Sequence, residues 1–441
     1  MSSRQRVSWT QRHRLGQIVR EADAGVYRPH HPSVTLRIRG DLQRPALERA
    51  WFRLQERHPV LLCGFDLDDF TWRLDTPADA TGIILADSAP GDTADSTVRL
   101  MEQLVDAPFD FTNGPLARLI LLRRPEETLF ALVLDHLTGD FWSLDLLMRD
   151  LTTFYTDELG LATEPLPPVS LSYPEQVRKQ NAYLDSPAGR RALQGAMESL
   201  KAVGPIPEAR FAGFSGATHA SYDHTGLVRA AFGSELTAAV FACARSFRMS
   251  PWTIIHAAVH KALYILSDQP AVGTMLMTAN RESLSVHQTV GFLASKVVVA
   301  TQRGDQATTT DFLRDFQRAM MNALDHIAIP WPQLIAHMEP SSLGCHARVP
   351  YVSFNPQNAT MRRWLGGWQF TGCETAPLEL AGSTPDAAIV ISLTELEQDI
   401  SVSMYHRTDW YPADAVEQLW QTIEQTLRDW VDVAVVGDKT L

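Results

Sequence analysis

Cysteine is scarce in this sequence, and its placement indicates neither a metal site nor a disulfide framework. The 441 residues contain 4 cysteines, at positions 63, 243, 345 and 373. None of them forms a CxxC pair or another spacing that is typical of metal ligands. So few thiols in so long a chain are typical of a protein from a reducing compartment. We therefore expect no bound metal and no structural disulfide.

Long hydrophobic runs are also absent. The longest apolar stretches, such as LFALVL and KVVVA, fall far short of the ~18 residues that a membrane-spanning helix requires. The opening segment MSSRQRVSWTQRHRLG is polar and basic and lacks the apolar core of a secretion signal. These absences predict a cytoplasmic protein that makes no contact with a membrane.

Positive charge is in deficit. The 39 Lys and Arg residues are outnumbered by 51 Asp and Glu residues, which leaves a formal net charge of −12. An acidic surface repels phosphate backbones, and no local basic patch offsets it, so we expect no nucleic-acid partner. Hydrophobic residues at 45% and charged residues at 20% are ordinary for a globular protein, which excludes extensive disorder.

Apolar periodicity predicts a mixed helix and strand structure in both halves of the chain. Alternating or continuous apolar runs predict strands, and apolar positions three and four residues apart predict helices. In the first half we expect strands over 33–38, 116–122 and 129–134, and helices over 45–58 and 143–157. In the second half we expect strands over 227–231, 272–276, 295–300, 387–396 and 399–406, and helices over 234–246, 251–267, 310–325 and 412–432.

A proline-rich stretch separates the two halves. Residues 160–175 contain TEPLPPVSLSYP, which has no periodicity and is typical of an inter-domain linker. The chain is also too long for one ordinary core. We therefore predict an α+β protein with an N-terminal lobe over 1–165, a linker over 166–178 and a C-terminal lobe over 179–441. The crevice between the lobes is the expected ligand site.

The segment DHLTGDFWS, residues 135–143, is the strongest candidate for chemistry. It follows an apolar strand and precedes a helix, a position in which a rigid support aims side chains. His136 can exchange a proton near neutral pH, and Asp140 can orient it or anchor the loop through a cation. Ser143 can cap the helix, whose open amides suit an oxyanion. The alternative is a capped strand-to-helix loop without catalysis.

A second pair of histidines invites a metal interpretation. His256 and His260 lie four residues apart in TIIHAAVHKAL, a spacing that places both on one helical face. No acidic residue accompanies them as in HExxH. We therefore interpret them as residues of a partly buried helix.

A central motif and seven further segments resemble, in order, the sequence pattern of condensation domains of nonribosomal peptide synthesis. The central family motif is HHxxxDG, and the corresponding residues here are DHLTGDF, so that His136 matches the second His and Asp140 the Asp. The other similar segments are SWTQRHRL at 8–15 (SxAQxRL), RHPVLLCGF at 57–65 (RHExLRTxF), PFDFTNGPL at 108–116 (PFDL…GPL), ANR…VGF at 279–292 (ANR…VGFFVNTL), HIAIPWPQL at 326–334 (DxPFERL), PYVSFNPQN at 350–358 (a segment ending in LQN) and DISVSMYHRTDWY at 399–411 (LxLxYxTDLF).

The resemblance implies two chloramphenicol acetyltransferase-like lobes in a V-shaped pseudo-dimer with a central tunnel. It implies that His136 is the catalytic residue and that Asp140 forms a structural ion pair with Arg281 across the lobes. The residues expected to line the tunnel are Phe141, Trp142, Ser143 and Asn358.

The implied reaction joins an acyl or aminoacyl thioester to an amine or hydroxyl acceptor, forming an amide or an ester. The donor would be carried on the phosphopantetheine of an acyl or peptidyl carrier protein that docks in trans. The chain itself would bind no cofactor and would act as a monomer. Whether His136 acts as a base, as a hydrogen-bond acceptor or only as an orienting group stays open.

Two substitutions depart from the family motif. Asp135 replaces the first His, and a hydrogen bond from His136 to its carboxylate would raise the pKa of His136 and favour imidazolium. Phe141 replaces the Gly, which would strain any backbone with positive φ and narrow the tunnel. Asp135, Asp140 and Ser143 also fit DxxxxDxxS, the signature of heterocyclisation domains. A third alternative is a catalytically idle module that recruits another enzyme to a carrier protein.

Overall fold

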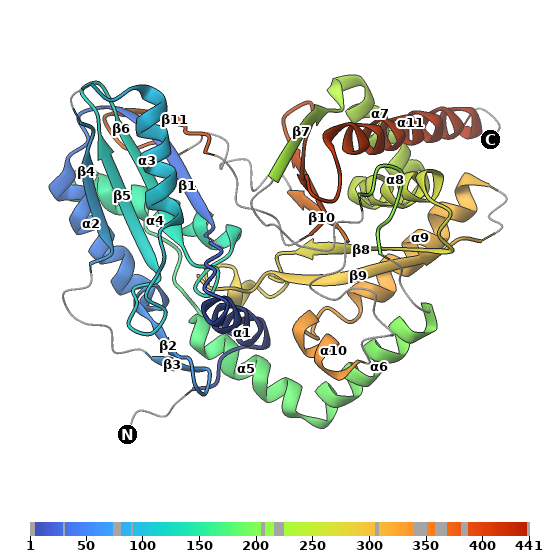
Figure 1. Ribbon diagram of the computed structural model, residues 1–441, viewed down its shortest axis with the longest axis horizontal. Helices are drawn as coiled ribbons and strands as arrows, with labels where there is room; N and C mark the ends of the chain where they lie inside the picture. The colour runs from blue at the N-terminus through green and yellow to red at the C-terminus, as the bar shows by residue number, and fades with distance from the viewer. Residues whose placement is uncertain are drawn as a thin grey trace. The chain divides into compact units, whose positions relative to one another are not determined.

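The protein consists of two compact units of mixed helix and strand. The computed structural model describes residues 5–29, 31–73, 81–89, 91–203, 208–215, 225–304, 308–338, 351–357, 368–380 and 387–438 (Figure 1). Unit 1 comprises Met1–Ser186, Ala279–Ala294 and Arg363–Ser383, and unit 2 comprises Pro187–Thr278, Ser295–Arg362 and Thr384–Leu441. The predicted α+β class with two lobes is confirmed.

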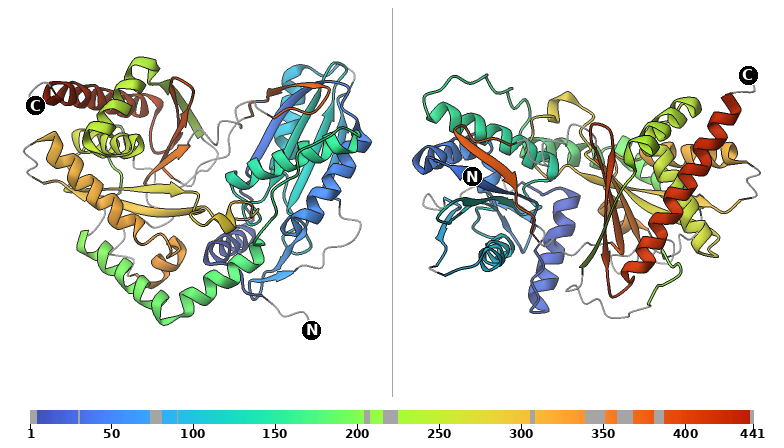
Figure 2. Two further views of the ribbon diagram at one scale, coloured as in Figure 1. Left: turned by 180° about the vertical axis from the view of Figure 1, so that it is seen from behind. Right: turned by 90° about the horizontal axis from the view of Figure 1, so that it is seen from above.

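Unit 1 is built around a mixed sheet in the order β11-β1-β6-β5-β4. Strands β5 and β6 are almost entirely buried, which explains their continuous apolar sequences. Helices α2 and α4 pack together on one face of this sheet, and α3 covers the other (Figure 2). Its elements are α1 (Trp9–Asp23), β1 (Ser33–Gly40), α2 (Arg44–Arg57), β2 (Gly64–Asp66), β3 (Thr71–Arg73), β4 (Ile83–Asp87), α3 (Ala94–Asp106), β5 (Ala117–Arg123), β6 (Thr128–Leu134), α4 (Phe141–Glu158), α5 (Tyr173–Asp185) and β11 (Cys373–Pro377).

Unit 2 contains a second mixed sheet in the order β7-β13-β12-β10-β8-β9. Its main core lies under α7, α8, α9 and α11. A smaller cluster around Val298 and Ala300 lies on the opposite face, against residues of α6 and α10. Its elements are α6 (Pro187–Val203), β7 (Thr225–Ala231), α7 (Gly233–Phe247), α8 (Pro251–Leu266), β8 (Ala271–Thr278), β9 (Ser295–Gln302), α9 (Thr309–Leu324), α10 (Trp331–His337), β10 (Val352–Gln357), β12 (Ile389–Glu395), β13 (Ile400–Arg407) and α11 (Ala413–Asp438).

The predicted boundaries between the lobes differ from the observed units. Two segments from the second half of the chain belong to unit 1, because β11 pairs with β1 and residues 279–294 pack beside the start of α4. Unit 1 also continues to Ser186, so the proline-rich stretch expected as a linker leads into α5 within the same unit. No helix in the part of the chain that the structure describes is long and apolar enough to cross a membrane.

The loop between strand β6 and helix α4 as candidate active site

The 135–143 loop is held rigidly where β6 ends. The backbone N–H of Asp135 donates to Leu116 O at 3.0 Å. The N–H of Leu137 donates to the Asp135 carboxylate at 2.9 Å, and the Thr138 hydroxyl donates to Asp135 O at 3.0 Å. From α1, the Gln11 amide donates to Leu137 O at 2.8 Å. The loop backbone is therefore fixed from both sides.

The half-buried imidazole of His136 is oriented by two contacts within unit 1. Its Nδ1 lies 2.9 Å from Gly139 O, and its ring packs against Phe292 at 4.4 Å between centroids. A carbonyl oxygen only accepts, so Nδ1 must carry the proton and donate. In the neutral ring the lone pair then lies on Nε2. His136 thus presents Nε2 as the atom able to accept a proton.

Asp135 is directed away from this imidazole. The side chain is fully buried, and its Oδ2 lies 3.8 Å from Arg14 Nη2 and 3.9 Å from His31 Nε2. Oδ2 has no hydrogen-bond partner among the described residues, so the hydrogen bond to His136 considered above is not formed. Burial raises the pKa of Asp135, and the nearby Arg14 only partly offsets that effect. Burial also lowers the pKa of His31 to about 3, so that Arg14 is the cation in contact with Asp135.

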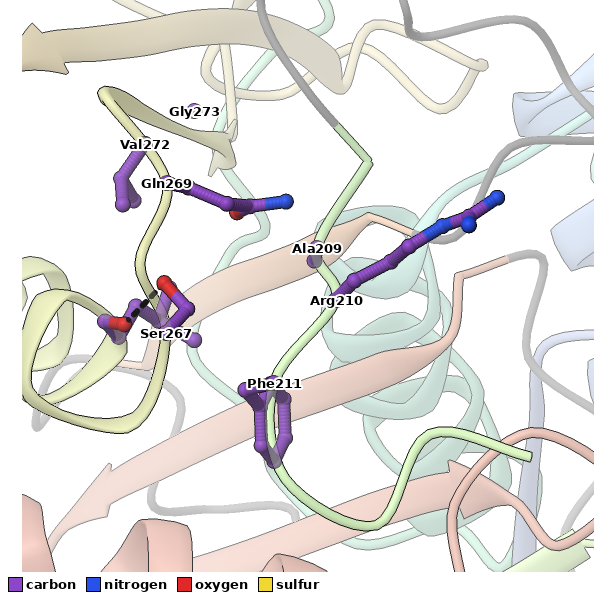
Figure 3. Close-up of a pocket in the computed structure, with 8 residues that line it drawn as sticks. Ala209, Arg210, Phe211, Ser267, Gln269, Val272 and Gly273 are labelled. Carbon is purple, nitrogen blue, oxygen red and sulfur yellow. Dashed lines mark hydrogen bonds between the residues drawn. The ribbon is translucent and has the colours of Figure 1, made fainter. Parts of the chain in front are cut away.

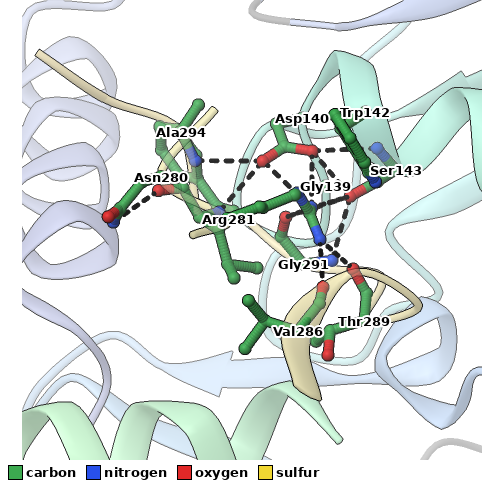
Figure 4. A network of polar contacts seen from close by, with 12 residues as sticks. Gly139, Asp140, Trp142, Ser143, Asn280, Arg281, Val286, Thr289, Gly291 and Ala294 are labelled. Atoms are coloured by element: carbon green, nitrogen blue, oxygen red, sulfur yellow. Dashed lines mark hydrogen bonds and ion pairs between the residues drawn. The ribbon is translucent and has the colours of Figure 1, made fainter. Parts of the chain in front are cut away.

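Asp140 is the N-cap of α4 and the centre of a buried polar network (Figure 4). Its Oδ1 accepts from the Ser143 backbone N–H at 2.9 Å. Its Oδ2 accepts from the backbone N–H groups of Leu293 at 3.1 Å and Ala294 at 3.0 Å. Asp140 therefore takes the capping role that was predicted for Ser143, which lies inside the helix, and it also fastens residues 293–294 to the loop.

Arg281 completes this network. Its Nη2 lies 3.0 Å from Asp140 Oδ1, and its Nη1 donates to Val286 O and Thr289 O at 2.8 and 2.6 Å. Burial alone would raise the pKa of Asp140, but Arg281 and the hydrogen bonds from Ser143 hold it below its usual range. The ion pair expected between Asp140 and Arg281 is present. It was expected to join the two lobes, but both residues belong to unit 1, because residues 279–294 pack there.

The residues expected to line a tunnel have different environments. Phe141 is 43% exposed at the start of α4, and it is absent from the residues with positive φ, so the expected strain does not arise. The Trp142 indole N–H donates to His287 O at 3.1 Å. Ser143 is fully buried, and its hydroxyl lies 2.8 Å from Asp140 Oδ1 and accepts from Gly291 N, which leaves it no surface to line a tunnel. Asn358 lies outside the described residues.

The sequence analysis did not predict the contacts that Gly139, Arg57 and His58 make in and near the 135–143 loop. The carbonyl of Gly139 sets the tautomer of His136, but a backbone oxygen leaves no signal in the side-chain pattern. Arg57 and His58, matched above only as a motif, both contact the Asp150 carboxylate, at 2.7 and 2.8 Å, and so fasten α2 to α4. Burial alone would raise the pKa of Asp150, but the hydrogen bond from His58 and the nearby arginines lower it.

The histidine pair of α8 is part of the core. His256 and His260 are fully buried, and the Nε2 atoms of both lie within hydrogen-bond distance of Thr274 Oγ1, at 2.6 and 2.8 Å. Burial lowers the pKa of both, to about 3 for His260. Among the described residues, no group of three or more His, Cys, Asp or Glu side chains is arranged to hold a metal.

Gly291 is expected to tolerate no side chain. A methyl group there would approach the buried ring of Tyr173 to within 2.2 Å, while the Gly291 N–H supports Ser143. We expect Gly291→Ala to lower the free energy of unfolding by about 1–3 kcal/mol, the usual cost of overpacking a core. Denaturant titration measures this. The control is Gly195→Ala in α6, where the added methyl lies 3.5 Å from His326, an ordinary contact. Equal stability of the two variants would contradict the prediction.

Comparison with known proteins identifies the family. The Condensation domain family matches residues 29–434, and this chain belongs to it. Malpinin synthetase of Mortierella alpina is 24% identical over 406 residues, which cover 89% of this chain and 5% of that protein. Nonribosomal peptide synthetase kk1B of Curvularia clavata is 24% identical over 417 residues, which cover 90% of this chain and 3% of that protein. This chain therefore spans only a small part of these relatives.

A solved structure shares the fold across nearly the whole chain. The X-domain in its complex with OxyB from teicoplanin biosynthesis superimposes with a TM-score of 0.82 at 18% identity. The alignment covers 98% of this chain and 94% of that one. Together with the family match, it confirms the chloramphenicol acetyltransferase-like two-lobed fold.

Proposed function

We propose that this chain is an acyltransferase that condenses a carrier-bound acyl or aminoacyl thioester with an amine or hydroxyl acceptor. The observation that carries the proposal is the fixed tautomer of His136, which places a proton-accepting Nε2 on a rigid loop. The nonribosomal peptide synthetase among the relatives supports the same class of reaction. The identity of the donor and acceptor would follow from the carrier protein that delivers the thioester on its phosphopantetheine.

The chemistry requires little beyond positioning and one proton acceptor. The acceptor nitrogen attacks the thioester carbonyl carbon, a C–N bond forms, and the C–S bond then breaks. A free amine of pKa ~8 is already partly nucleophilic at neutral pH. His136 Nε2 accepts the proton that the nitrogen loses and passes it to the departing thiolate, so that the products are an amide and a thiol.

Asp140 and Arg281 act as positioning residues in this scheme. They hold residues 293–294 against the start of α4, and the adjoining residue Phe292 packs its ring on His136. Oriented reactants gain ~7–11 kcal/mol, so a rigid loop is a direct contribution to the rate.

The heterocyclisation alternative has weaker support. Asp135 and Ser143 are fully buried and Asp140 is 2% exposed, and all three side chains form hydrogen bonds inside unit 1.

The mass of the product tests the heterocyclisation alternative. We would incubate the full chain with acyl N-acetylcysteamine thioesters and carrier-bound acyl groups in the presence of cysteine, serine or threonine as acceptor, because cyclisation requires a thiol or hydroxyl beside the amine. The product of simple condensation has the mass of the thioester donor plus the acceptor less the released thiol. Cyclisation lowers the mass of that product by one water.

A recruitment module is the second candidate, and the exposed ring of Phe141 favours it. The family motif has Gly where this bulky ring stands immediately after Asp140. The X-domain of teicoplanin biosynthesis, which shares this fold, was solved in a complex with OxyB. Binding of a carrier protein without turnover of any thioester would support recruitment and would overturn the proposed acyl transfer.

Replacement of Phe141 by glycine tests what this ring does in the proposed acyl transfer. If the chain is an acyltransferase narrowed by this ring, Phe141→Gly should raise the rate of condensation several-fold for bulky donors. The added glycine should cost at most ~1 kcal/mol of stability, since it stands in the first turn of α4. Rates with a small and a bulky thioester measure the effect, and Phe141→Leu, which keeps an apolar side chain, is the control. A lower rate in Phe141→Gly would show instead that the ring binds substrate.

A further inference from the structure

Phe292 is the aromatic residue that packs on the proposed base. Its ring centroid lies 4.4 Å from that of the His136 imidazole, and the two ring planes are inclined by 31°. At this spacing and inclination the rings overlap face to face rather than edge to face. The face of a benzene ring carries the negative part of its quadrupole, and Phe292 therefore presents that face to the imidazole.

The backbone on both sides of this ring is fixed by side chains of unit 1. The Tyr173 hydroxyl of α5 donates to Phe292 O at 2.9 Å. Gly291 lies so close to the Tyr173 ring that no side chain would fit between them. On the other side, the Asp140 carboxylate accepts from the backbone N–H groups of residues 293–294. The chain therefore has little freedom at residue 292, and its ring is held where it meets the imidazole.

A stacked benzene ring affects the charge of the imidazole. When Nε2 accepts a proton, the imidazole becomes an imidazolium, whose positive charge is spread over the ring. A cation within about 6 Å of an aromatic centroid is attracted by the negative face of that ring. Phe292 therefore stabilises the protonated form of His136, which is the form produced when the acceptor nitrogen loses its proton.

Other charges near this imidazole are paired within unit 1. Asp140 is paired with Arg281 at 3.0 Å. Asp135 lies 3.8 Å from Arg14, and Glu21 lies 3.6 Å from the same guanidinium. These groups carry the same charge whichever side chain packs on the imidazole.

The titratable groups on neighbouring segments also keep their charge. His31 interacts electrostatically with His136 but stays neutral, because burial lowers its pKa to about 3. Tyr173 keeps its proton, because burial raises the pKa of its phenol. Arg118 of β5 is a permanent cation, and its guanidinium donates to backbone carbonyls. A change in the titration of His136 on replacement of Phe292 would therefore report the loss of the ring.

We infer that Phe292 and Tyr173 are positioning residues for His136. Tyr173 fixes the backbone of Phe292, and the Phe292 ring orients the imidazole and stabilises the imidazolium. The role of both residues in catalysis rests on the proposed acyl transfer. The effect of the ring on the protonation of His136 does not require turnover.

The titration of His136, followed by NMR of ¹³C-labelled histidines, tests the effect of the ring. The signal of His136 among the 14 histidines is assigned by its loss in His136→Ala. Phe292→Leu should lower the pH of half-protonation by about 0.4–0.7 unit, which corresponds to a cation–π contact of ordinary strength. The matched control is Phe154→Leu, because Phe154 is also partly buried against the core of unit 1, and it should leave this titration unchanged. An unchanged or raised midpoint in Phe292→Leu would overturn the stabilisation of the imidazolium.

Fluorinated phenylalanines separate the electronic effect of the ring from its fit. Phenylalanine with one, two or three fluorine atoms at position 292 keeps nearly the same shape, while each fluorine withdraws electron density from the ring face. The midpoint of the His136 titration should fall with each added fluorine. Equal midpoints across the series would show that the ring acts by packing alone.

Replacement of Tyr173 by phenylalanine tests the hold on the backbone. Tyr173→Phe removes the hydrogen bond to Phe292 O, so the Phe292 ring can shift on the imidazole. The turnover number for condensation should fall by about tenfold to 10²-fold, since a displacement of ~1 Å in a catalytic site costs about 10²-fold. The midpoint of the His136 titration should fall as well.

The matched control for this variant is Tyr264→Phe. The Tyr264 hydroxyl of α8 also donates to a backbone carbonyl, Thr301 O at 2.7 Å, but in unit 2. The hollow beside this end of α8, at Ser267 and Gln269 (Figure 3), has a volume of about 10 Å³, which is at the lower limit for one water molecule and too small for a substrate. Both variants lose one hydrogen bond of the same kind, so only a positioning role predicts that turnover falls in Tyr173→Phe alone. Equal turnover of the two variants would overturn the role of Tyr173.

Acyl transfer and the role of Phe292 can fail separately. If the chain turns over no thioester, acyl transfer is wrong, and the NMR titration of Phe292→Leu still decides whether the ring stabilises the imidazolium. If His136→Ala loses turnover while Phe292→Leu titrates and turns over as the wild type does, acyl transfer stands and Phe292 has no positioning role.

Discussion

Replacement of His136 by alanine is expected to lower the turnover number for condensation by about 10²–10⁴-fold, the range that a general base contributes. The reason is the Nε2 lone pair, whose position the hydrogen bond from Nδ1 to Gly139 O fixes. The variant should keep its fold, because the imidazole is only half-buried and the loop backbone is held by Asp135, Thr138 and Gln11 rather than by this ring. Single-turnover kinetics with a carrier-bound donor measure the loss.

The matched control is His337→Ala. The Nδ1 atom of His337 also bonds a backbone carbonyl, Gln333 O at 2.8 Å, but it lies on α10 in unit 2. Its replacement should leave the turnover number within about twofold. Full activity of His136→Ala would show that His136 does not act as the general base. A large loss accompanied by a lowered melting temperature would show that the effect comes from folding.

Replacement of Arg281 by alanine is expected to cost about 3–5 kcal/mol of unfolding free energy, because it leaves the buried carboxylate of Asp140 without its cation. The carbonyls of Val286 and Thr289 also lose their donor. For a unit of this size the loss corresponds to a fall of roughly 6–20 °C in the melting temperature. Activity should fall too, since the Asp140 carboxylate that anchors residues 293–294 would lose the cation that holds it in place.

The control for this variant is an exposed pair. Arg318 lies beside Asp315 on α9 with most of its side chain in solvent, and Arg318→Ala should change the stability by less than ~1 kcal/mol. The double variant Asp140→Leu with Arg281→Met removes both charges together and should recover part of the loss. If Arg281→Ala and Arg318→Ala had the same melting temperature, the buried ion pair would contribute no more stability than the exposed one.

The same ion pair predicts an acid dependence of stability. The pKa of Asp140 is lower in the folded protein than in the unfolded chain, so its stabilising contribution is complete above the unfolded value of ~3.9. That contribution is lost as the pH falls from there through the folded pKa. The difference in unfolding free energy between the wild type and Asp140→Asn should therefore be largest near neutrality and should shrink below pH ~4. A difference that is independent of pH would contradict this account.

Much of the fold was predictable from local pattern. The hairpin of β5 and β6 and the long helix α4 follow from apolar runs and helical spacing in the sequence itself. The membership of segments in units was not predictable in this way. Strand β11 pairs with β1, and the Thr35 hydroxyl donates to Leu378 O across 343 positions in sequence. A strand's sequence records which faces it buries but not which distant strand lies beside it.

The site shows the same division between local and distant information. The pairing of Asp140 with Arg281 was predicted, since the resemblance supplied a partner for each position. The direction of Asp135 was not, because adjacent residues of a loop point into different surroundings that only the packed structure defines. Asp135 lies against Arg14 of α1, more than a hundred residues earlier in the chain.

The insertion of β11 and of residues 279–294 into unit 1 also bears on how the protein is made. A ribosome releases the residues of β1, β6 and α4 long before it releases Arg281, and longer still before Cys373–Pro377. Until then the carboxylate of Asp140 lacks the guanidinium of Arg281, and β1 lacks β11 along one edge. Long-range pairings of this kind slow folding and leave strand edges open to other chains. The first residues of unit 1 are therefore synthesised before unit 2, but unit 1 cannot complete its fold until segments that follow much of unit 2 have been synthesised.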